Sequence, residues 1–229
     1  MKLRLNINRR HKIIVAGFSV TRYTLHKMKI LVGLGNPGEK YALNRHNVGF
    51  MFVEYLFSAF AKREAQNVYR FKRDKDLQSD IAIINVSRYT LHDKQHTTLR
   101  ATRYTMREMI IVKPQTYMNK SGDAVAACVS RFALHDLRND LIVVHDDLDI
   151  PFGKFKIQMQ GPKQHNGLTD IQNKLRTMDF LRVRIGIDNR LAENRINGEE
   201  YVLQNFTEEE RAQLPEVFER IEKRFEEYL

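Results

Sequence analysis

The chain has little of several residue types that mark particular classes of protein. It has one cysteine, Cys128, and no tryptophan among 229 residues. A single cysteine cannot form an internal disulfide, and Cys128 lies in an apolar run typical of a buried helix face, so a reducing compartment is indicated and a catalytic cysteine is not. No apolar stretch approaches the roughly 20 residues needed to cross a bilayer, so we expect no membrane partner.

Acidic residues are missing from the first part of the chain. Residues 1–29 hold eight Lys and Arg and no Asp or Glu, within a total net charge of +10. Basic residues mixed with short apolar pieces are typical of a mitochondrial import segment, and the alternative is a disordered basic tail. We therefore predict a basic extension over 1–28, a domain over 29–229, and a mitochondrial location or otherwise a cytoplasmic one.

Apolar periodicity predicts strands that alternate with helices. Strands are expected at 30–34, 81–86, 109–112, 141–144 and 181–187, of which 141–144 is central and covered on both faces and 181–187 alternates and has one wetter face. Helices are expected at 48–60, at 124–133 and after a capping box formed by Thr207 and Glu210. This order predicts one α/β domain with its sheet sandwiched between helices. The basic region 73–107 is interpreted as a solvated hairpin rather than an added RNA contact.

A short sequence pattern occurs three times outside the predicted core. It stands at Thr21–Leu25, Ser87–Leu91 and Thr102–Met106, each time with Arg before Tyr. Its unequal spacing excludes a solenoid, which needs a fixed period. The β-propensity of these residues explains the pattern without a function.

Polar side chains follow several of the predicted strands. They are Asn36, His46, Asn119, Asp146 and Asn166. Loops at the carboxyl ends of strands meet at one edge of an α/β sheet, so we expect these residues to converge. Amides suit peptide groups and an oxyanion, and a His–Asp pair suits removal of a proton from water. The set predicts hydrolysis of an ester or amide, with His46 as base and Asp146 fixing its tautomer.

Two other interpretations of the motifs are weaker. Gly33, Gly35 and Gly38 match a dinucleotide-binding fingerprint, but Pro37 removes an amide donor from the turn and no acid ends a second strand at the required spacing. The acidic run His145–Asp149 suggests a metal site, but no helical His pair or spaced Cys set accompanies it. We therefore expect no cofactor and no metal.

Six motifs occur in a characteristic order along the chain. They are Gly33–Gly38, Tyr41, Arg45–Phe50, Lys113–Gly122, His145–Asp149 and His165–Leu168. In this order they resemble the motifs of bacterial-type peptidyl-tRNA hydrolases, from about residue 29 to 206. The resemblance implies a monomer with a mixed, twisted sheet flanked by helices, which cleaves the ester between a peptide and the terminal ribose of tRNA without a metal.

The resemblance also implies roles for single residues. His46 is similar to the family's catalytic base and Asp146 to its partner, while Asn36 and Asn119 correspond to residues that hold the peptide. Asn166 corresponds to an amide that steers the water or stabilises the oxyanion. Further expected contacts are Tyr41 and Met118 as cleft walls and Lys154, Lys156 and Arg184 on tRNA phosphates.

The sequence departs from the family pattern in places. The segment 158–164 is poor in glycine where the family is glycine-rich, and Asn44 stands where Thr is common. A related splicing-factor branch binds partners without catalysis, so a non-catalytic RNA-binding protein of the same fold is an alternative. The intact His46, Asp146 and asparagines favour the hydrolase.

Overall fold

The computed structural model describes residues 13–15, 18–20, 23–25, 28–63, 70–92, 100–162, 164–190 and 196–228. The chain divides into two compact units. The larger unit comprises Lys29–Ile84 and Ile110–Leu229, and the smaller unit comprises Met1–Met28 and Asn85–Met109. Most of the predicted N-terminal extension, including residues 1–12, lies outside the described residues. The boundary at residue 28 stays a prediction, and the structure groups Asn85–Met109 with the N-terminal residues.

Strands and helices alternate along the chain. The strands are β1 (Ile13–Val15), β2 (Phe18–Val20), β3 (Tyr23–Leu25), β4 (Lys29–Gly33), β5 (Lys72–Asp74), β6 (Ser79–His92), β7 (Arg100–Pro114), β8 (Leu141–Pro151), β9 (Phe155–Gln158) and β10 (Leu181–Asp188). The α-helices are α1 (Val48–Arg63), α2 (Ser121–Arg131), α3 (Leu137–Asp140), α4 (Asn166–Leu175), α5 (Gly198–Leu203) and α6 (Glu208–Phe225). Single turns of 3-10 helix are η1 (Glu39–Tyr41), η2 (Arg45–Asn47), η3 (Met118–Lys120) and η5 (Glu226–Tyr228).

The main sheet is mixed. Its strands follow the order β5-β6-β7-β4-β8-β10-β9, and β3 also pairs with β7. β8 is parallel to both β4 and β10, whereas β9 runs antiparallel to β10. Residues 141–147 of β8 are all buried, as expected of a central strand covered on both faces. Residues 182–187 of β10 are buried as well, so the prediction of a wetter face for 181–187 is wrong.

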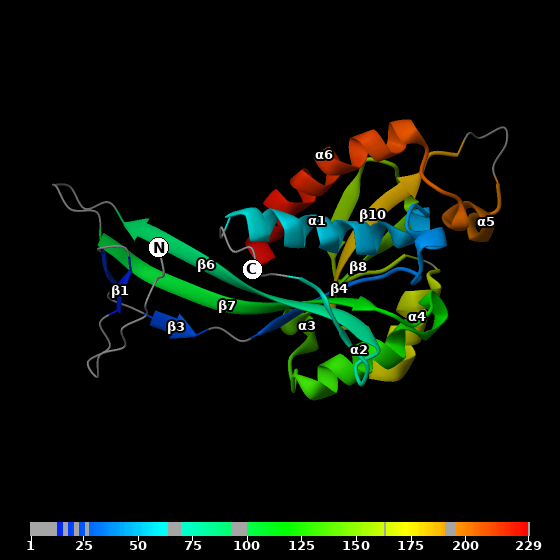
Figure 1. Cartoon of the computed structure of the whole chain (residues 1–229). Coiled ribbons are helices and arrows are strands. Elements are labelled where there is room, and N and C mark those ends of the chain that lie inside the picture. The colour runs from blue at the N-terminus through cyan, green and yellow to red at the C-terminus, as the bar shows by residue number, and fades with distance from the viewer. Residues whose placement is uncertain are drawn as a thin grey trace. The chain divides into compact units, whose positions relative to one another are not determined.

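Helices cover both faces of the sheet in the larger unit. α1 and α6 lie over one face, and α2 and α4 over the other (Figure 1). Phe52 of α1 packs edge-to-face on Phe218 of α6, with ring centroids 5.6 Å apart. The predicted α/β class with a mixed sheet between helices is confirmed. None of the described helices is long and apolar enough to cross a membrane.

Two strands extend well beyond their predicted bounds. Apolar periodicity marks only 81–86 of β6 and 109–112 of β7. The remaining residues of both strands are largely polar or charged and lack a continuous apolar run, so the pattern does not mark them. The described part of region 73–107 lies mostly in the neighbouring strands β6 and β7, as a hairpin requires, and its solvation stays a prediction.

The glycines of the first loop serve close packing of α1 on the sheet. A Cβ on Gly33 would lie 2.5 Å from Gly49 O, and a Cβ on Gly49 would lie 2.5 Å from Val144 O. A Cβ on Gly35 would lie 2.7 Å from the Phe50 ring. Gly38 has a backbone φ of 106°, which favours glycine. These contacts explain the glycine spacing by helix packing.

The predicted capping box at the start of α6 is confirmed. The Thr207 N–H donates to Glu210 Oε2 at 2.9 Å, and the Glu210 N–H donates to Thr207 Oγ1 at 3.2 Å. Cys128 is fully buried in α2, and burial raises the pKa of its thiol to about 11. A thiol in that state is not a nucleophile, which agrees with the sequence prediction.

Candidate active site

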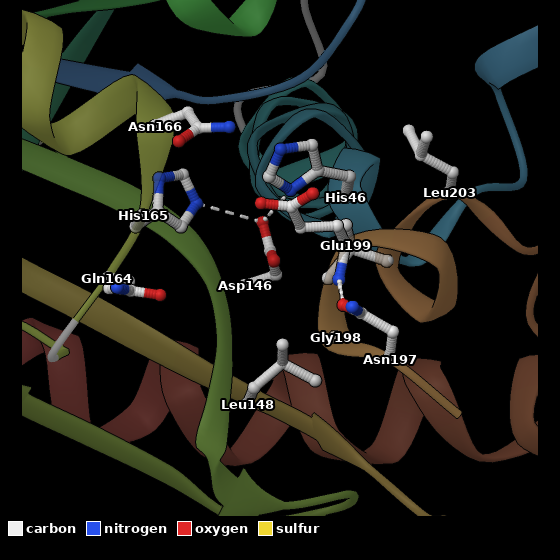
Figure 2. Close-up of a pocket in the computed structure, with 11 residues that line it drawn as sticks. His46, Asp146, Leu148, Gln164, His165, Asn166, Asn197, Gly198, Glu199 and Leu203 are labelled. Atoms are coloured by element: carbon white, nitrogen blue, oxygen red, sulfur yellow. Dashed lines mark hydrogen bonds and ion pairs between the residues drawn. The ribbon is translucent and has the colours of Figure 1, made fainter. Parts of the chain in front are cut away.

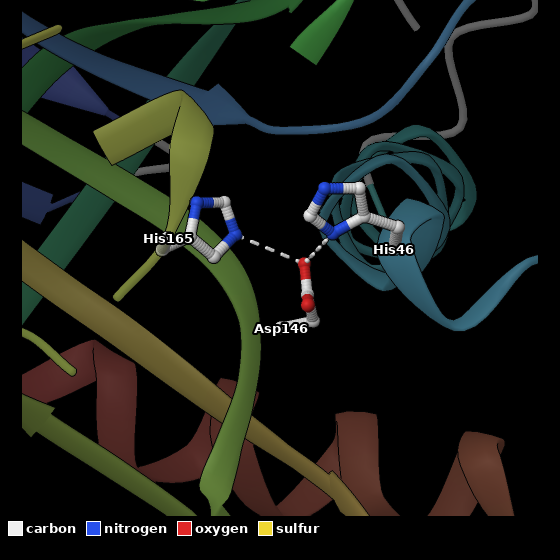
Figure 3. A group of neighbouring side chains, drawn as sticks. All are labelled: His46, Asp146 and His165. Carbon is white, nitrogen blue, oxygen red and sulfur yellow. Dashed lines mark hydrogen bonds and ion pairs between the residues drawn. The ribbon is translucent and has the colours of Figure 1, made fainter. Parts of the chain in front are cut away.

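Asp146 of β8 stands at the centre of a buried cluster. Its Oδ1 lies 2.8 Å from His46 Nδ1 and 3.0 Å from His165 Nε2, so one carboxylate oxygen bridges two imidazoles (Figure 3). Burial would raise the pKa of Asp146, but the two histidines hold it well below its usual range. Asp146 is therefore ionised, and its carboxylate accepts a hydrogen bond from each of the two rings.

The hydrogen bonds of His165 fix its tautomer. Its Nδ1 accepts the Leu168 N–H at 3.3 Å as the cap of α4, so the ring proton is on Nε2 and is donated to Asp146. The neighbouring His145 is completely buried, and burial holds its pKa well below the usual value. His145 packs edge-to-face on His165 and supports that ring from behind.

His46 is in η2, directly before α1, and donates Nδ1–H to Asp146. Burial of the ring would lower the pKa of His46, but the charge and hydrogen bond of Asp146 outweigh it and raise the pKa. The pairing leaves Nε2 with a free lone pair. In Figure 2 this nitrogen and the Asn166 side chain point toward one another. An imidazole held in this way is suited to take a proton from water.

The cluster opens into a pocket of about 600 Å³. The residues that line it are His46, Asp146, Leu148, Gln164, His165, Asn166, Asn197, Gly198, Glu199, Val202 and Leu203. The α5 residues lie across the pocket from His165 and Asn166 (Figure 2). The pocket therefore combines a base, an amide and a partly apolar wall.

A buried ion pair attaches the His46 turn to the start of α6. Arg45 donates from Nη2 to Glu210 Oε2 at 2.7 Å and from Nη1 to the Asn205 carbonyl at 2.6 Å. Its guanidinium also lies over the Tyr201 ring at 4.2 Å. Because Tyr201 belongs to α5, these contacts connect the base to the opposite wall of the pocket.

The same cluster has the composition of a small metal site. The ligand atoms of His46, Asp146 and His165 lie within 4.8 Å of one another. The nitrogens that face Asp146 are both engaged in hydrogen bonds to it, and a metal would have to replace those protons. The described geometry fits a hydrogen-bonded triad, and independence from metal stays a prediction.

Comparison with known proteins places the chain in a family. The sequence model of the family "Peptidyl-tRNA hydrolase" matches residues 30–229. The chain belongs to the peptidyl-tRNA hydrolase family. A peptidyl-tRNA hydrolase of Chloroflexus aggregans is 40% identical over 195 residues, covering 85% of this chain and 88% of the relative. One of Pseudothermotoga lettingae is 40% identical over 197 residues, covering 84% and 86%.

Solved structures agree with the family assignment. A crystal structure of peptidyl-tRNA hydrolase from Acinetobacter baumannii matches with a TM-score of 0.63 and 26% identity, covering 85% of each chain. A second, a complex of peptidyl-tRNA hydrolase with N-propanol, matches with a TM-score of 0.62 and 25% identity. It covers 89% of this chain and 94% of that chain.

The structure brings together three of the predicted site residues in this member of the peptidyl-tRNA hydrolase family. His46, Asp146 and Asn166 all line the pocket. The pocket lining does not include Asn36, Tyr41, Met118 or Asn119. Their peptide-binding roles therefore stay predictions.

Asn36 and Met118 form a connected layer beside the pocket. Asn36 Oδ1 accepts the Met118 N–H at 2.8 Å. A Cβ on Gly167, the residue after Asn166, would lie 2.6 Å from Met118 Sδ. The Asn36 oxygen thus positions a loop that supports the start of α4.

Tyr41 and Asn119 lie nearer to solvent. Tyr41 is half-buried and packs edge-to-face on the exposed Tyr117, with ring centroids 6.4 Å apart. Asn119 is exposed in η3. Both side chains therefore have surface exposed to solvent outside the pocket lining.

The predicted phosphate contacts differ in exposure. Lys154 and Lys156 are exposed on and beside the edge strand β9. Arg184 is only 6% exposed, and its Nε lies 2.5 Å from Asp147 Oδ2. A guanidinium held inside by a carboxylate organises the sheet, so Lys154 and Lys156 are the stronger candidates for contact with phosphate.

A buried arginine braces the glycine-poor loop before His165. Arg182 is fully buried and donates to the carbonyls of Phe180 at 3.0 Å, Met178 at 3.2 Å and Met159. Burial lowers the pKa of Arg182 to about 10. Because Met159 opens this loop, the arginine fixes the loop at one end and Gln164 lines the pocket at the other.

Three features of the site were not predicted. His165 occurs in a motif that identified the family, but nothing local in the sequence indicates its bond to Asp146. Asn47 was also missed; its side chain accepts the Asn36 N–H and donates to the Asn36 carbonyl, both at 2.9 Å. The α5 wall, including Glu199, has no sequence signal, because α5 is held by long-range contacts such as that of its Tyr201 ring with Arg45.

Proposed function

We propose that this chain hydrolyses the ester between the peptide and the terminal ribose of peptidyl-tRNA, with His46 as general base. The observation that carries this proposal is the 2.8 Å contact of His46 Nδ1 with Asp146 Oδ1, in a pocket that Asn166 also lines. This contact leaves the Nε2 lone pair available for a proton. The names of its relatives indicate which ester is the substrate.

The proposed reaction consists of two proton transfers. His46 Nε2 takes a proton from water while the water oxygen bonds to the ester carbonyl carbon, and the Asn166 amide donates a hydrogen bond to the oxyanion. When the carbonyl re-forms, the bond from carbon to the ribose oxygen breaks, and His46 returns its proton to that oxygen. The products are a free peptide acid and a tRNA with an intact terminal hydroxyl.

Asp146 has two functions in this mechanism. It keeps the proton of neutral His46 on Nδ1, and it stabilises the imidazolium that forms once Nε2 is protonated. The second hydrogen bond, from His165, keeps the carboxylate oriented toward His46. The base is thus held in one tautomer and one orientation before the substrate binds.

A direct assay tests this function. Purified protein is incubated with N-acetyl-aminoacyl-tRNA and with the same aminoacyl-tRNA carrying a free amino group, with and without a chelator. We expect the N-acylated ester to be cleaved at the same rate with chelator. Failure to cleave it, or a loss with chelator that added metal restores, would contradict the proposal.

Two finer properties are also proposed. The chain acts as a monomer, so light scattering should give a mass near 27.0 kDa. Its basic residues 1–28 direct import into mitochondria, and a reporter fused to them should colocalise with that organelle. A dimer mass would contradict the first property, and a uniformly cytosolic reporter the second.

A further inference from the structure

Positive charge is divided unequally between the two units. The smaller unit, Met1–Met28 with Asn85–Met109, contains 12 Lys and Arg against two acids, Asp93 and Glu108. The larger unit contains 26 bases and 26 acids. The whole net charge of +10 therefore lies in the smaller unit, and the unit with the catalytic cluster is formally neutral.

Four of these bases lie on two bonded strands. Arg88 is in β6, and Arg100, Arg103 and Arg107 are in β7. The two strands are neighbours in the sheet. Glu108 is the one acid in the described strands of the smaller unit, so the charge of this hairpin is not balanced from within.

The repeated Arg-Tyr pattern is brought together by strand pairing. β3 runs parallel to β7 in a register that pairs Tyr23 with Tyr104 and Thr24 with Thr105. The third copy, Ser87–Leu91, is in β6, on a strand that also bonds to β7. The described part of the first copy, Tyr23–Leu25, and the two other copies thus occupy three connected strands, although up to 81 residues separate them in the sequence.

A group of strands rich in arginine and tyrosine has a characteristic partner. Guanidinium groups pair with phosphate oxygens in a bidentate manner, and aromatic rings stack on unpaired bases. A neutral catalytic unit exerts little long-range attraction on a polyanion, whereas a unit of high positive charge does so at a distance.

We propose that strands β6 and β7 of the smaller unit, which hold Arg88, Arg100, Arg103 and Arg107, bind the phosphate backbone of RNA separately from the pocket that cleaves the ester. This inference rests on the proposed function only in naming tRNA as the RNA that is presented. The affinity of such binding depends on salt concentration and not on the RNA sequence, which suits an enzyme that must accept many tRNAs. In this arrangement β6 and β7 bind the tRNA, and the pocket hydrolyses the ester.

The test uses the full chain with a charge-matched control. One variant carries Arg88→Gln, Arg100→Gln, Arg103→Gln and Arg107→Gln. The control carries Arg131→Gln, Arg138→Gln, Lys223→Gln and Arg224→Gln, four bases of the larger unit whose side chains are largely exposed. Each set removes four positive charges. Binding of deacylated tRNA is measured between about 50 and 200 mM salt.

We expect the first variant to bind at least about tenfold more weakly and its salt slope to fall by about one for each phosphate that it no longer neutralises. The control should stay close to the parent chain. Equal losses in both variants would show that only net charge matters, and no loss in the first would show that the hairpin does not contact RNA. Either result overturns the inference.

Further arms exclude misfolding and identify the ligand. The same four positions changed to Lys should restore most of the binding, because the charge returns; failure to do so would overturn a backbone contact. Competition with an unrelated duplex RNA should match tRNA, whereas displacement by heparin alone would indicate an unspecific polyanion site and overturn the inference. Hydrolysis of a short RNA-free acyl ester should be unchanged in the first variant, and absent hydrolysis in the parent chain would count against the proposed function alone.

Discussion

At the scale of single residues, one oxygen atom organises the site. Asp146 Oδ1 accepts from both His46 and His165, so neither ring can turn without breaking a buried hydrogen bond. Breaking a hydrogen bond to a buried charge is costly, which keeps the base in its working orientation. The Asp146 charge also raises the pKa of His46, so the pH dependence of hydrolysis reports directly on this contact.

Replacing Asp146 by Asn should move the pH dependence in a defined direction. Hydrolysis needs neutral His46, so its rate falls as the pH drops below the His46 pKa. Without the carboxylate charge, burial alone acts on the ring and lowers that pKa, so the acid limb should move to lower pH. The maximal rate should also fall, because the imidazolium loses its partner.

A matched control separates this effect from simple loss of charge. Asp149→Asn removes an exposed carboxylate from the same strand, three residues further on. Its pH–rate profile, measured in single-turnover experiments, should overlay that of the parent chain. An unmoved acid limb in Asp146→Asn would mean that the carboxylate does not set the pKa of the base.

The sequence allowed His46, Asp146 and Asn166 to be placed together, because the loops that carry them were expected at one edge of the sheet. In the structure β8 continues to Pro151, so Asp146 lies within the strand. The sequence did not reveal the bond from His165 to Asp146, which depends on how the loop before α4 closes. For Arg184 the sequence predicted a surface role that the structure does not support. A basic residue in an alternating strand suggests a surface contact, and only the tertiary fold shows Asp147 beside it.

At the scale of elements, the position of His46 depends on how η2 and α1 are anchored. Gly33 and Gly49 let α1 approach the sheet closely, and Arg45 joins η2 to the start of α6. The capping box could be predicted because its two residues are three apart in the sequence. The ion pair of Arg45 could not be predicted, because Glu210 lies 165 residues away.

Arg45→Met should destabilise the fold strongly. The change leaves the Glu210 carboxylate buried without its partner, which costs about 3 to 5 kcal/mol when a buried pair is broken. The free energy of unfolding in denaturant measures this loss. Arg45→Met with Glu210→Met should lose less than the two single changes together, whereas Lys223→Met, which breaks an exposed pair with Glu219, should change little.

Gly49→Ala should disturb both stability and catalysis. The added Cβ would lie 2.5 Å from Val144 O and 2.6 Å from Leu34 N, both backbone atoms that cannot move aside cheaply. Overpacking of this kind costs about 1 to 3 kcal/mol or more, and α1 must shift together with His46. Ser58→Ala, at an exposed position of the same helix, is the control. Unchanged melting temperature and kcat in Gly49→Ala would refute this account of the helix contact.

At the scale of the whole molecule, capture of the substrate and cleavage of the ester are assigned to different charge environments. Local patterns in the sequence indicated a basic extension over 1–28 and a basic region at 73–107. In the structure, part of the N-terminal region belongs to the same unit as Asn85–Met109, because β3 pairs with β7. The paired residues are 81 apart in the sequence, so no short-range pattern predicts this pairing. The net charge then lies entirely in the smaller unit. The exposed Lys154 and Lys156, on and beside β9, are a local basic feature of the neutral larger unit.

Lys154→Gln with Lys156→Gln should therefore impair capture without impairing chemistry. We expect a higher KM for peptidyl-tRNA and a smaller salt slope, by about one for each phosphate that the variant no longer neutralises. The kcat on a short RNA-free acyl ester should stay the same, because neither lysine lines the pocket. An unaltered salt slope would remove both lysines from the tRNA contact.

The most direct test of the central claim is single-turnover hydrolysis of peptidyl-tRNA by His46→Ala. Loss of a general base lowers the rate by about 10² to 10⁴, and substrate binding should change little because the side chain makes no capture contact. A fall of that size with unchanged binding is the predicted result. Hydrolysis close to that of the parent chain would contradict the assignment of His46 as the base.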